Sequence, residues 1–239
     1  MKPNTLARAL SRDAVRARLK APRPPKPRSD EATTRRLVAA GNTEPFDAGK
    51  YPKVMMPGSV YRPPGQEHVP SVPAAVLVPL VEREGGFTVL LTQRTADLKS
   101  HAGQISFPGG RLEPEDADAA AGALRETYEE IGLSAGHIEV LGTLDAYSTV
   151  TNFEVTPVVA VVTPPFDLKP DPVEVADIFE VPLAFFLDPV NHQRHSRELG
   201  EENGRKILRA FYAIPYGERY IWGATAGMLI NLYEVLTAT

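Results

Sequence analysis

Apolar runs of strand length alternate with one clearly amphipathic helix along the body of the chain. The run Ala74–Val81 predicts a buried strand, because nearly every position in it is apolar. Residues 84–86, Glu-Gly-Gly, form a turn signal, and Phe87–Thr92 predicts a second strand, so the pair indicates a hairpin. Ala117–Ile131 has helical composition, and Gly132 predicts its end.

The same pattern continues toward the C-terminus. Further strands are predicted at Ile138–Leu144, Val155–Val162, Ile207–Ile214 and Tyr220–Trp222, a short helix at Val181–Leu187, and a final helix at Ala224–Leu236 that is apolar on one side. A proline pair at 164–165 breaks the chain, and Tyr216-Gly217 predicts a turn. Strands interleaved with few helices predict an α/β (α+β) fold, with a mixed β-sheet sandwiched between helices.

Residues 1–70 differ from this body, which we place at residues 71–239. Ser11 predicts the N-cap of a short helix that runs to about Leu19. A basic, proline-rich stretch follows, and we expect an arm of weak secondary structure that drapes over the domain or a partner. Residues 1–36 hold 11 Lys and Arg against 3 Asp and Glu, so the arm resembles a solvated basic tail more than a transit peptide.

Composition excludes several classes of function. The chain has no cysteine, which excludes disulfides, thiolate nucleophiles and cysteine-bound zinc. No apolar run reaches the roughly 18–20 residues of a membrane helix, and we expect a cytoplasmic protein. After residue 36 the chain has 15 basic and 27 acidic residues, so no basic footprint for nucleic acid is present there. The oligomeric state stays open, with a homodimer through the arm as one option.

The predicted helix carries three carboxylates on one face. With Glu126 at 0° on a helical wheel, Glu129 falls near 300° and Glu130 near 40°. The apolar residues of the helix fall at roughly 140–200°: Leu124, Tyr128 and Ile131. We therefore expect the acids to face outward from a buried stripe. Like charges this close repel one another, and a divalent cation such as Mg²⁺ or Mn²⁺ removes that repulsion.

Two further features support this metal face. Arg125 lies four residues before Glu129, which lets the two side chains pair and fixes the carboxylate. Gly109 and Gly110 precede the helix and let the backbone approach a ligand or metal closely. Between turn and helix stand four acids, of which at least one is expected to add to the site: Glu113, Glu115, Asp116 and Asp118.

These residues resemble the Nudix box, which is a glycine, a spaced acid, and then Arg-Glu-x-x-Glu-Glu-x-Gly. The second half is intact from Arg125 to Gly132. Counting back from Arg125, the spaced acid falls on Ala117, and counting forward from Gly110 it falls on Asp116, because one extra residue separates the halves. Whether Asp116 or Glu115 takes the role of that acid is left open by the count.

The segment before the box narrows the resemblance. Residues 90–110, LLTQRTADLKSHAGQISFPGG, are similar to the motif upstream of the box in coenzyme A pyrophosphatases, with Thr95 and Lys99 as conservative departures. Residues 155–159 and 220–227 also resemble that branch. The candidates for substrate binding are Arg94, Lys99, Gly109, Gly110 and Arg111. His101 lies in the same stretch of sequence and is a further candidate for contacting phosphates.

The resemblance implies a metal-dependent hydrolase of small diphosphates. Its expected substrate is coenzyme A or its thioesters, which it would cleave into 3′,5′-ADP and 4′-phosphopantetheine or its acylated form. Its catalytic set would be Arg125, Glu126, Glu129 and Glu130, with the three glutamates as metal ligands. Candidates for the general base are Glu129, Glu154 and Glu174, whereas His192 and His195 are expected on an exposed polar loop. Alternatives are a Nudix enzyme for ADP-ribose, NADH or dinucleoside polyphosphates, and a binding module without turnover, which the intact acids disfavour.

Overall fold

The computed structural model describes residues 3–24, 26, 28–51, 70–96, 102–202 and 205–238. Its helices are α1 (Pro3–Ala9), α2 (Arg12–Lys20), α3 (Asp30–Ala40), α4 (Ala119–Ile131), α5 (Leu183–Phe186) and α6 (Gly223–Thr237). Its strands are β1 (Glu44–Pro45), β2 (Val72–Arg83), β3 (Gly86–Arg94), β4 (Ile105–Ser106), β5 (Gly109–Arg111), β6 (Ile138–Thr143), β7 (Tyr147–Ser148), β8 (Phe153–Val162), β9 (Val175–Pro182), β10 (Gln193–Glu202), β11 (Arg205–Tyr216) and β12 (Arg219–Trp222).

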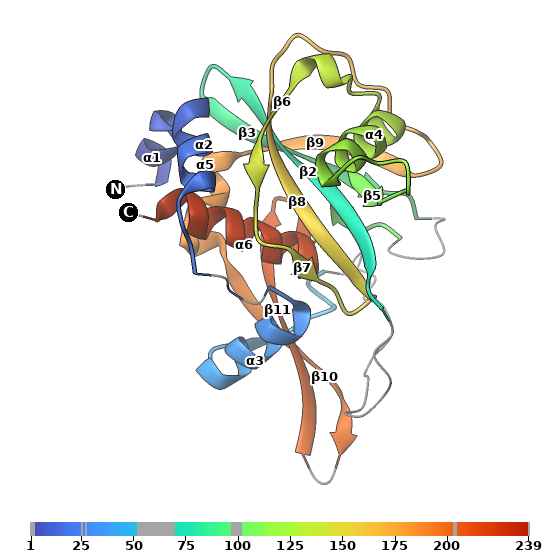
Figure 1. Ribbon diagram of the computed structural model, residues 1–239. Coiled ribbons are helices and arrows are strands. Elements are labelled where there is room, and N and C mark those ends of the chain that lie inside the picture. The colour runs from blue at the N-terminus through green and yellow to red at the C-terminus, as the bar shows by residue number, and fades with distance from the viewer. Residues whose placement is uncertain are drawn as a thin grey trace.

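The main sheet is mixed and has the strand order β4-β3-β2-β8-β6, with β5 paired to β2, β7 to β8 and β9 to β3. Strands β2 and β8 run parallel, and the other pairs in this sheet are antiparallel. Figure 1 shows α4 on one side of the sheet and α1, α2, α5 and α6 gathered on the other. The predicted mixed sheet between helices is therefore confirmed.

Both faces of β2 are buried, which explains its almost continuous apolar sequence. Ala75 and Leu77 pack toward α4, while Val78 and Leu80 belong to the large core on the opposite face. The predicted hairpin is present, because β2 and β3 pair in antiparallel register across the turn. The predicted elements at β6, β8, α5, β11, β12 and α6 are present as well, within a few residues of their expected bounds.

Helix α6 was expected to be apolar on one side, and that expectation is wrong. Residues 225–232 are all buried, so the helix is enclosed on every side over two turns. It lies among β11, β12, α2 and α3. A helix surrounded in this way needs no polar face, and its sequence carries almost none.

The second sheet has the order β1-β10-β11-β12 and carries α3. Its strand β10 occupies the stretch that we expected to be an exposed loop with His192 and His195. His195 is instead buried at 5% exposure, and its ring lies within 6.5 Å of four aromatic rings: Phe46, Tyr51, Phe211 and Tyr220. His192 is half-buried, with one ring nitrogen 2.8 Å from the Phe186 carbonyl. Neither histidine therefore lies on an exposed loop.

The N-terminal arm has more structure than its sequence predicts. The expected helix at Ser11 is confirmed, since the Ser11 hydroxyl accepts a hydrogen bond from the Ala14 amide at the start of α2. Two further helices, α1 and α3, were not predicted. Val15 and Leu19 of α2 and Leu37 of α3 are buried in the main core, so the expected solvated tail is wrong for these helices. The division at residue 70 stays a prediction.

The basic side chains of the arm bind acids of the body. Arg12 contacts Glu82 and Glu139, with Nε 2.7 Å from Glu82 Oε1 and Nη1 2.9 Å from Glu139 Oε2. Arg28 is 8% exposed and contacts Asp145 and Glu234. These pairs explain why a basic segment stays with an acidic domain.

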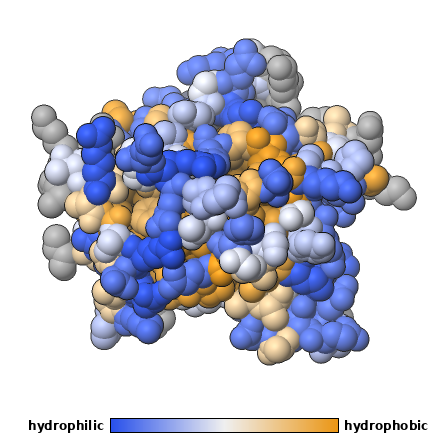
Figure 2. Space-filling model, turned by 90° about the horizontal axis from the view of Figure 1, so that it is seen from above, coloured by the Kyte–Doolittle hydropathy of each residue, from blue (hydrophilic) through white to orange (hydrophobic). Residues whose placement is uncertain are grey.

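The outer surface is mixed in character. Figure 2 shows hydrophilic side chains interleaved with smaller hydrophobic areas over the face seen from above. No helix among the described residues has the length and apolar composition that crossing a membrane requires.

Candidate active site

Helix α4 holds the acidic residues in place between two defined ends. At its start, the Asp118 carboxylate accepts a hydrogen bond from the Ala121 amide at 2.8 Å. At its end, Gly132 adopts a left-handed conformation with φ 69° and donates its N–H to the Tyr128 carbonyl. The register of the helix on the sheet is therefore fixed at both ends.

The buried face of α4 differs from the predicted stripe. It is formed by small residues together with one acid and one large apolar residue: Gly122, Ala123, Thr127, Glu130 and Ile131. Tyr128, expected to be buried, is 62% exposed. Small residues let the helix lie close to Ala75 and Leu77 of β2, which places the centre of the buried face near Ala123 and Thr127 rather than near the larger side chains.

The three glutamates consequently have three different environments. Glu129 is 57% exposed, Glu126 is 20% exposed and Glu130 is only 5% exposed. The expectation of three outward acids is thus wrong for Glu130, which lies at the edge of the helix that faces the sheet. Burial raises the pKa of Glu130 to about 7 and also raises the pKa of Glu126.

The glycine pair was expected to form a turn, but it lies in the short strand β5, paired with β2, and brings the backbone against these two carboxylates. Gly109 donates its N–H to Glu130 Oε2 at 3.2 Å. A Cβ on Gly109, where φ is +146°, would lie 2.4 Å from the Ala75 carbonyl oxygen, and a Cβ on Gly110 would lie 2.5 Å from the Glu126 carboxylate. Both positions therefore need glycine, and the close approach predicted for this turn is present.

Arg125 joins the turn and the helix through several acids. It makes two hydrogen bonds to Asp116, of 3.1 and 2.9 Å, and donates Nη1 to Glu126 at 3.1 Å and to Glu129 at 3.2 Å. The predicted pair with Glu129 is confirmed. The Arg125 guanidinium lowers the pKa of Asp116, whose carboxylate also accepts the Glu113 amide.

The structure also distinguishes Asp116 from Glu115. Asp116 points inward to Arg125 with 7% of its side chain exposed, whereas Glu115 is exposed. The extra residue in the spacing is therefore accommodated in the turn before the helix, and Asp116 is the acid that meets Arg125.

A second arginine bridges two acids that lie 44 positions apart in the sequence. Arg94, at the end of β3, has Nη1 3.5 Å from Glu130 Oε1 and Nη2 3.5 Å from Glu174 Oε2. Glu174 is held there because the Thr95 amide donates to its carbonyl at 2.9 Å. Glu154 is not part of this group: its carboxylate accepts a hydrogen bond from Ser71 at 3.1 Å, on an exposed part of β8.

These acids have the chemistry of ligands for a hard divalent cation. Glu126 and Glu174 both raise the pKa of Glu130 by like-charge repulsion, which a cation would remove. Among the described residues, however, no three His, Asp or Glu side chains form a preassembled cluster. Arg94 and Arg125 lie between the carboxylates instead, so binding of a cation would rearrange these side chains.

The remaining predicted residues are less defined. Arg111 is exposed, and its guanidinium lies 5.4 Å from the centre of the Phe153 ring. Lys99 and His101 lie outside the described residues. The pairing of Arg94 with Glu174 was not predicted, because the two are 80 positions apart and only the pairing of β3 with β9 brings them together.

Comparisons with known proteins identify the family of this chain. The family model described as NUDIX domain matches residues 71–201. An Escherichia coli K12 protein described as uncharacterized Nudix hydrolase NudL is 38% identical over 165 residues, which cover 66% of this chain and 80% of that protein. The Cronobacter sakazakii protein of the same description is 39% identical over the same shares.

Among solved structures, a binary complex of the Caenorhabditis elegans Ap4A hydrolase is 25% identical, with a TM-score of 0.38, and the match covers 47% of this chain and 80% of that one. A nudix family protein from Enterococcus faecalis is 17% identical, with a TM-score of 0.44, and the match covers 72% of this chain and 63% of that one.

Proposed function

This chain belongs to the NUDIX domain family of hydrolases, and from that premise we propose that it cleaves the diphosphate of coenzyme A or of its thioesters. The family activity is metal-dependent hydrolysis of the diphosphate in nucleoside diphosphate derivatives. The narrower substrate rests on the segment before the acidic helix, residues 90–110, which resembles the coenzyme A branch. The products would be 3′,5′-ADP and 4′-phosphopantetheine, or its acylated form.

One observation carries the catalytic part of the proposal: Glu126 and Glu130 meet the Gly109-Gly110 turn directly, with Glu130 accepting a hydrogen bond from the Gly109 amide. We assign Glu126, Glu129 and Glu130 as the residues that would hold Mg²⁺ or Mn²⁺. Such a cation neutralises diphosphate charge and makes water more acidic. Arg125 orients the carboxylates from the side, since Asp116 anchors it.

The phosphates would be bound by groups beside these acids. Arg94 and Arg111 supply cations, and the glycine turn lets a phosphate approach the backbone closely. Lys99 completes the set from the sequence. For the general base we favour Glu174. Arg94 connects it to Glu130 of the acidic helix, but Glu174 itself lies outside that helix.

The test is a panel of diphosphates with Mg²⁺ or Mn²⁺, with the products identified by mass. Coenzyme A, 3′-dephospho-coenzyme A, ADP-ribose, NADH and a dinucleoside polyphosphate separate the proposed substrate from the alternatives. The proposal expects the highest kcat/KM for coenzyme A or a thioester. A higher kcat/KM for ADP-ribose or NADH would overturn the coenzyme A assignment while leaving the hydrolase class intact.

The same assay tests the proposed base. Glu174→Gln should lower kcat strongly, with little change in KM. Glu154→Gln is the matched control, because Glu154 lies apart from the cluster, and its kcat should match the wild type. An unchanged kcat for Glu174→Gln would move the role of base to Glu129.

A further inference from the structure

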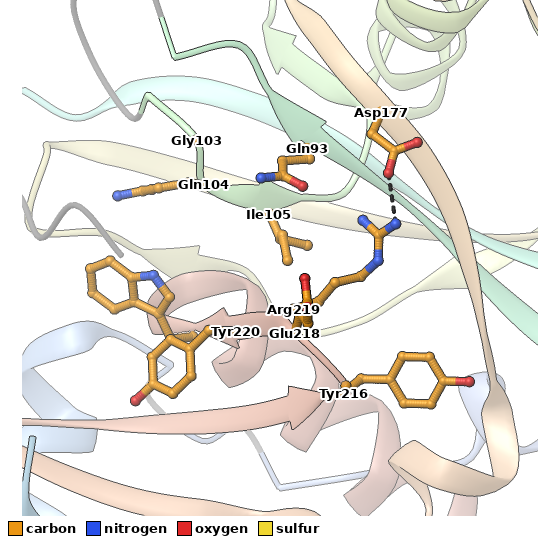
Figure 3. Close-up of a pocket in the computed structure, with 11 residues that line it drawn as sticks. Gln93, Gly103, Gln104, Ile105, Asp177, Tyr216, Glu218, Arg219 and Tyr220 are labelled. Atoms are coloured by element: carbon orange, nitrogen blue, oxygen red, sulfur yellow. Dashed lines mark hydrogen bonds and ion pairs between the residues drawn. The ribbon is translucent and has the colours of Figure 1, made fainter. Parts of the chain in front are cut away.

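A pocket of about 440 Å³ lies between the main sheet and the β11–β12 hairpin (Figure 3). Gln93 of β3, Ile105 of β4 and Asp177 of β9 line it from the sheet, and Arg219 and Trp222 line it from the hairpin. Its volume falls within the range of small-molecule sites, which is roughly 300–1,000 Å³. None of the residues assigned above to metal or phosphate binding lines it.

The pocket is nevertheless adjacent to the acidic cluster. Gln93 directly precedes Arg94 on β3, and Asp177 follows Glu174 by three residues at the start of β9. Successive residues of a strand point to opposite faces, so Arg94 reaches Glu130 on the α4 side while Gln93 lines the pocket on the other side. The end of β3 thus has the acidic cluster on one face and this pocket on the other, so a substrate with its diphosphate beside Arg94 would reach the pocket by passing around the end of the strand.

Charge decides which end of the substrate the pocket suits. Among the described residues that line it, Asp177 and Glu218 are acidic and Arg219 is the single cation. Arg219 donates to Asp177 at 2.6 Å, as Figure 3 shows, and its guanidinium lies 3.7 Å from the centre of the Phe179 ring. The described lining thus has a formal charge of −1 and no cation left over for a phosphate, so it disfavours an anionic group.

The rest of the lining suits a neutral chain that alternates amides with apolar groups. Gln93 offers an amide that both donates and accepts, and Figure 3 draws it without a hydrogen bond to the other lining residues. Ile105, Tyr216 and Trp222 add apolar and aromatic surface. A nucleoside 3′-phosphate has the wrong charge for this lining, whereas a pantetheine arm has the right charge, the amides and the methyl groups.

We propose that this pocket binds the neutral pantetheine arm of the substrate, leaving the adenosine 3′-phosphate end outside it. This inference rests on the proposed coenzyme A substrate. It also divides recognition between two regions, with Gln93 acting on the pantetheine end and Lys99, by its sequence motif, on the 3′-phosphate end.

Trp222 provides a direct test, because it is the only tryptophan in the chain and lines the pocket. The two products are titrated separately into the wild-type protein with Mg²⁺, with excitation at the red edge of tryptophan absorption, where adenine does not absorb. The expected result is a saturable change in fluorescence with 4′-phosphopantetheine and none with 3′,5′-ADP. A change with 3′,5′-ADP alone, or with neither product, overturns the proposal, including the case in which a nucleobase occupies the pocket.

Kinetics of two variants provide an independent test. Gln93→Met keeps the side-chain volume but removes the amide, so KM should rise about three- to tenfold, as expected for one or two lost hydrogen bonds. The rise should be equal for coenzyme A and 3′-dephospho-coenzyme A, and absent for ADP-ribose measured as a substrate or competitive inhibitor. Lys99→Ala should instead raise KM for coenzyme A more than for the dephospho form.

An equal effect of Gln93→Met on ADP-ribose would mean that the residue acts on the part shared by all substrates, which overturns the proposal. Failure of the proposed function gives a different result. In that case coenzyme A is not hydrolysed by the wild type, whatever the tryptophan titration shows.

Discussion

The buried carboxyl of Glu130 should make the stability of the metal-free protein fall as pH rises toward neutrality. Its pKa is raised from 4.5 to about 7 because the side chain is buried against the sheet. Between those two values the folded chain keeps a proton that the unfolded chain releases, so stability decreases with rising pH. The loss is complete above the folded pKa, and below about 4.5 the contribution is fully present.

The magnitude follows from the change in proton affinity. At about 1.36 kcal/mol for each pKa unit, the raised pKa corresponds to on the order of 3 kcal/mol between pH ~4.5 and neutrality. For a chain of 239 residues this equals roughly 6–12 °C in the unfolding midpoint. Little discount for solvent screening is needed, since Glu130 is only 5% exposed.

The assay compares urea unfolding of wild type and Glu130→Gln, without metal, at several pH values from about 5 to about 8. Across that range, the unfolding free energy of the wild type should fall relative to that of Glu130→Gln by on the order of 3 kcal/mol. Using the difference cancels the titrating groups that do not interact with Glu130. Glu129→Gln is the matched control, because Glu129 is the preceding residue but is 57% exposed, so its replacement should change the unfolding free energy much less than the replacement of Glu130.

Added Mg²⁺ should then stabilise the wild type at neutral pH more than Glu130→Gln, because the cation binds the folded carboxylates. Glu130→Gln should also lose most turnover. A pH-independent difference between wild type and Glu130→Gln would refute the reasoning, since it would mean that Glu130 is ionised in the folded protein at all these pH values.

Two further variants test the turn and the arm. Gly110→Ala should lower kcat by about tenfold or more, because its Cβ would lie 2.5 Å from the Glu126 carboxylate. The control in steady-state kinetics is Gly85→Ala, where a Cβ meets nothing within 4 Å. Equal kcat values for the two variants would contradict the prediction. Leu19→Ala should lower the unfolding free energy by about 2–5 kcal/mol, because Leu19 is buried in the main core. Lys20→Ala, at the exposed next residue, should leave the unfolding free energy almost unchanged. Equal denaturation midpoints for the two variants would show that the arm unfolds separately.

The sequence predicted the strongly patterned elements well, and the reason is physical. Strand β2 is buried on both faces and therefore has an almost continuous apolar sequence, and α4 has a capping aspartate and a terminal glycine. Strand β10 has a polar, charged sequence and lies in the smaller sheet, so it has no comparable pattern. The strand conformation of β10 depends on its pairing with β11, and the local sequence pattern does not show that pairing.

The arm was misinterpreted for a related reason. The opposite charges of residues 1–36 and of the body were visible in the sequence, but charge alone does not say whether two segments touch. In the structure, Arg12 lies between Glu82 and Glu139, and Val15, three residues later in the same helix, is fully buried. Some of the basic side chains of the arm therefore attach it to acids that lie far along the chain.

The misplaced face of α4 has a different origin. A helical wheel weighs residues by hydrophobicity, which assigned Tyr128 to the core, whereas close packing on β2 favours small residues such as Ala123 and Thr127. Turning the helix in this way buries Glu130. The error in the predicted face thus concealed the burial of Glu130, which raises the pKa of its carboxyl.

The two arginines of the site are held differently, which separates their parts in the proposed reaction. Arg125 is bound by Asp116 through two hydrogen bonds, and Asp116 is not among the proposed metal ligands. A cation that takes Glu126 and Glu129 leaves that anchor intact, so Arg125 stays in place. Among the described residues, the Arg94 guanidinium instead contacts Glu130 and Glu174, each at 3.5 Å. If a cation bound Glu130, Arg94 would lose one of these two partners and could contact the diphosphate. We therefore propose that Arg125 positions the carboxylates and that Arg94 binds the phosphate.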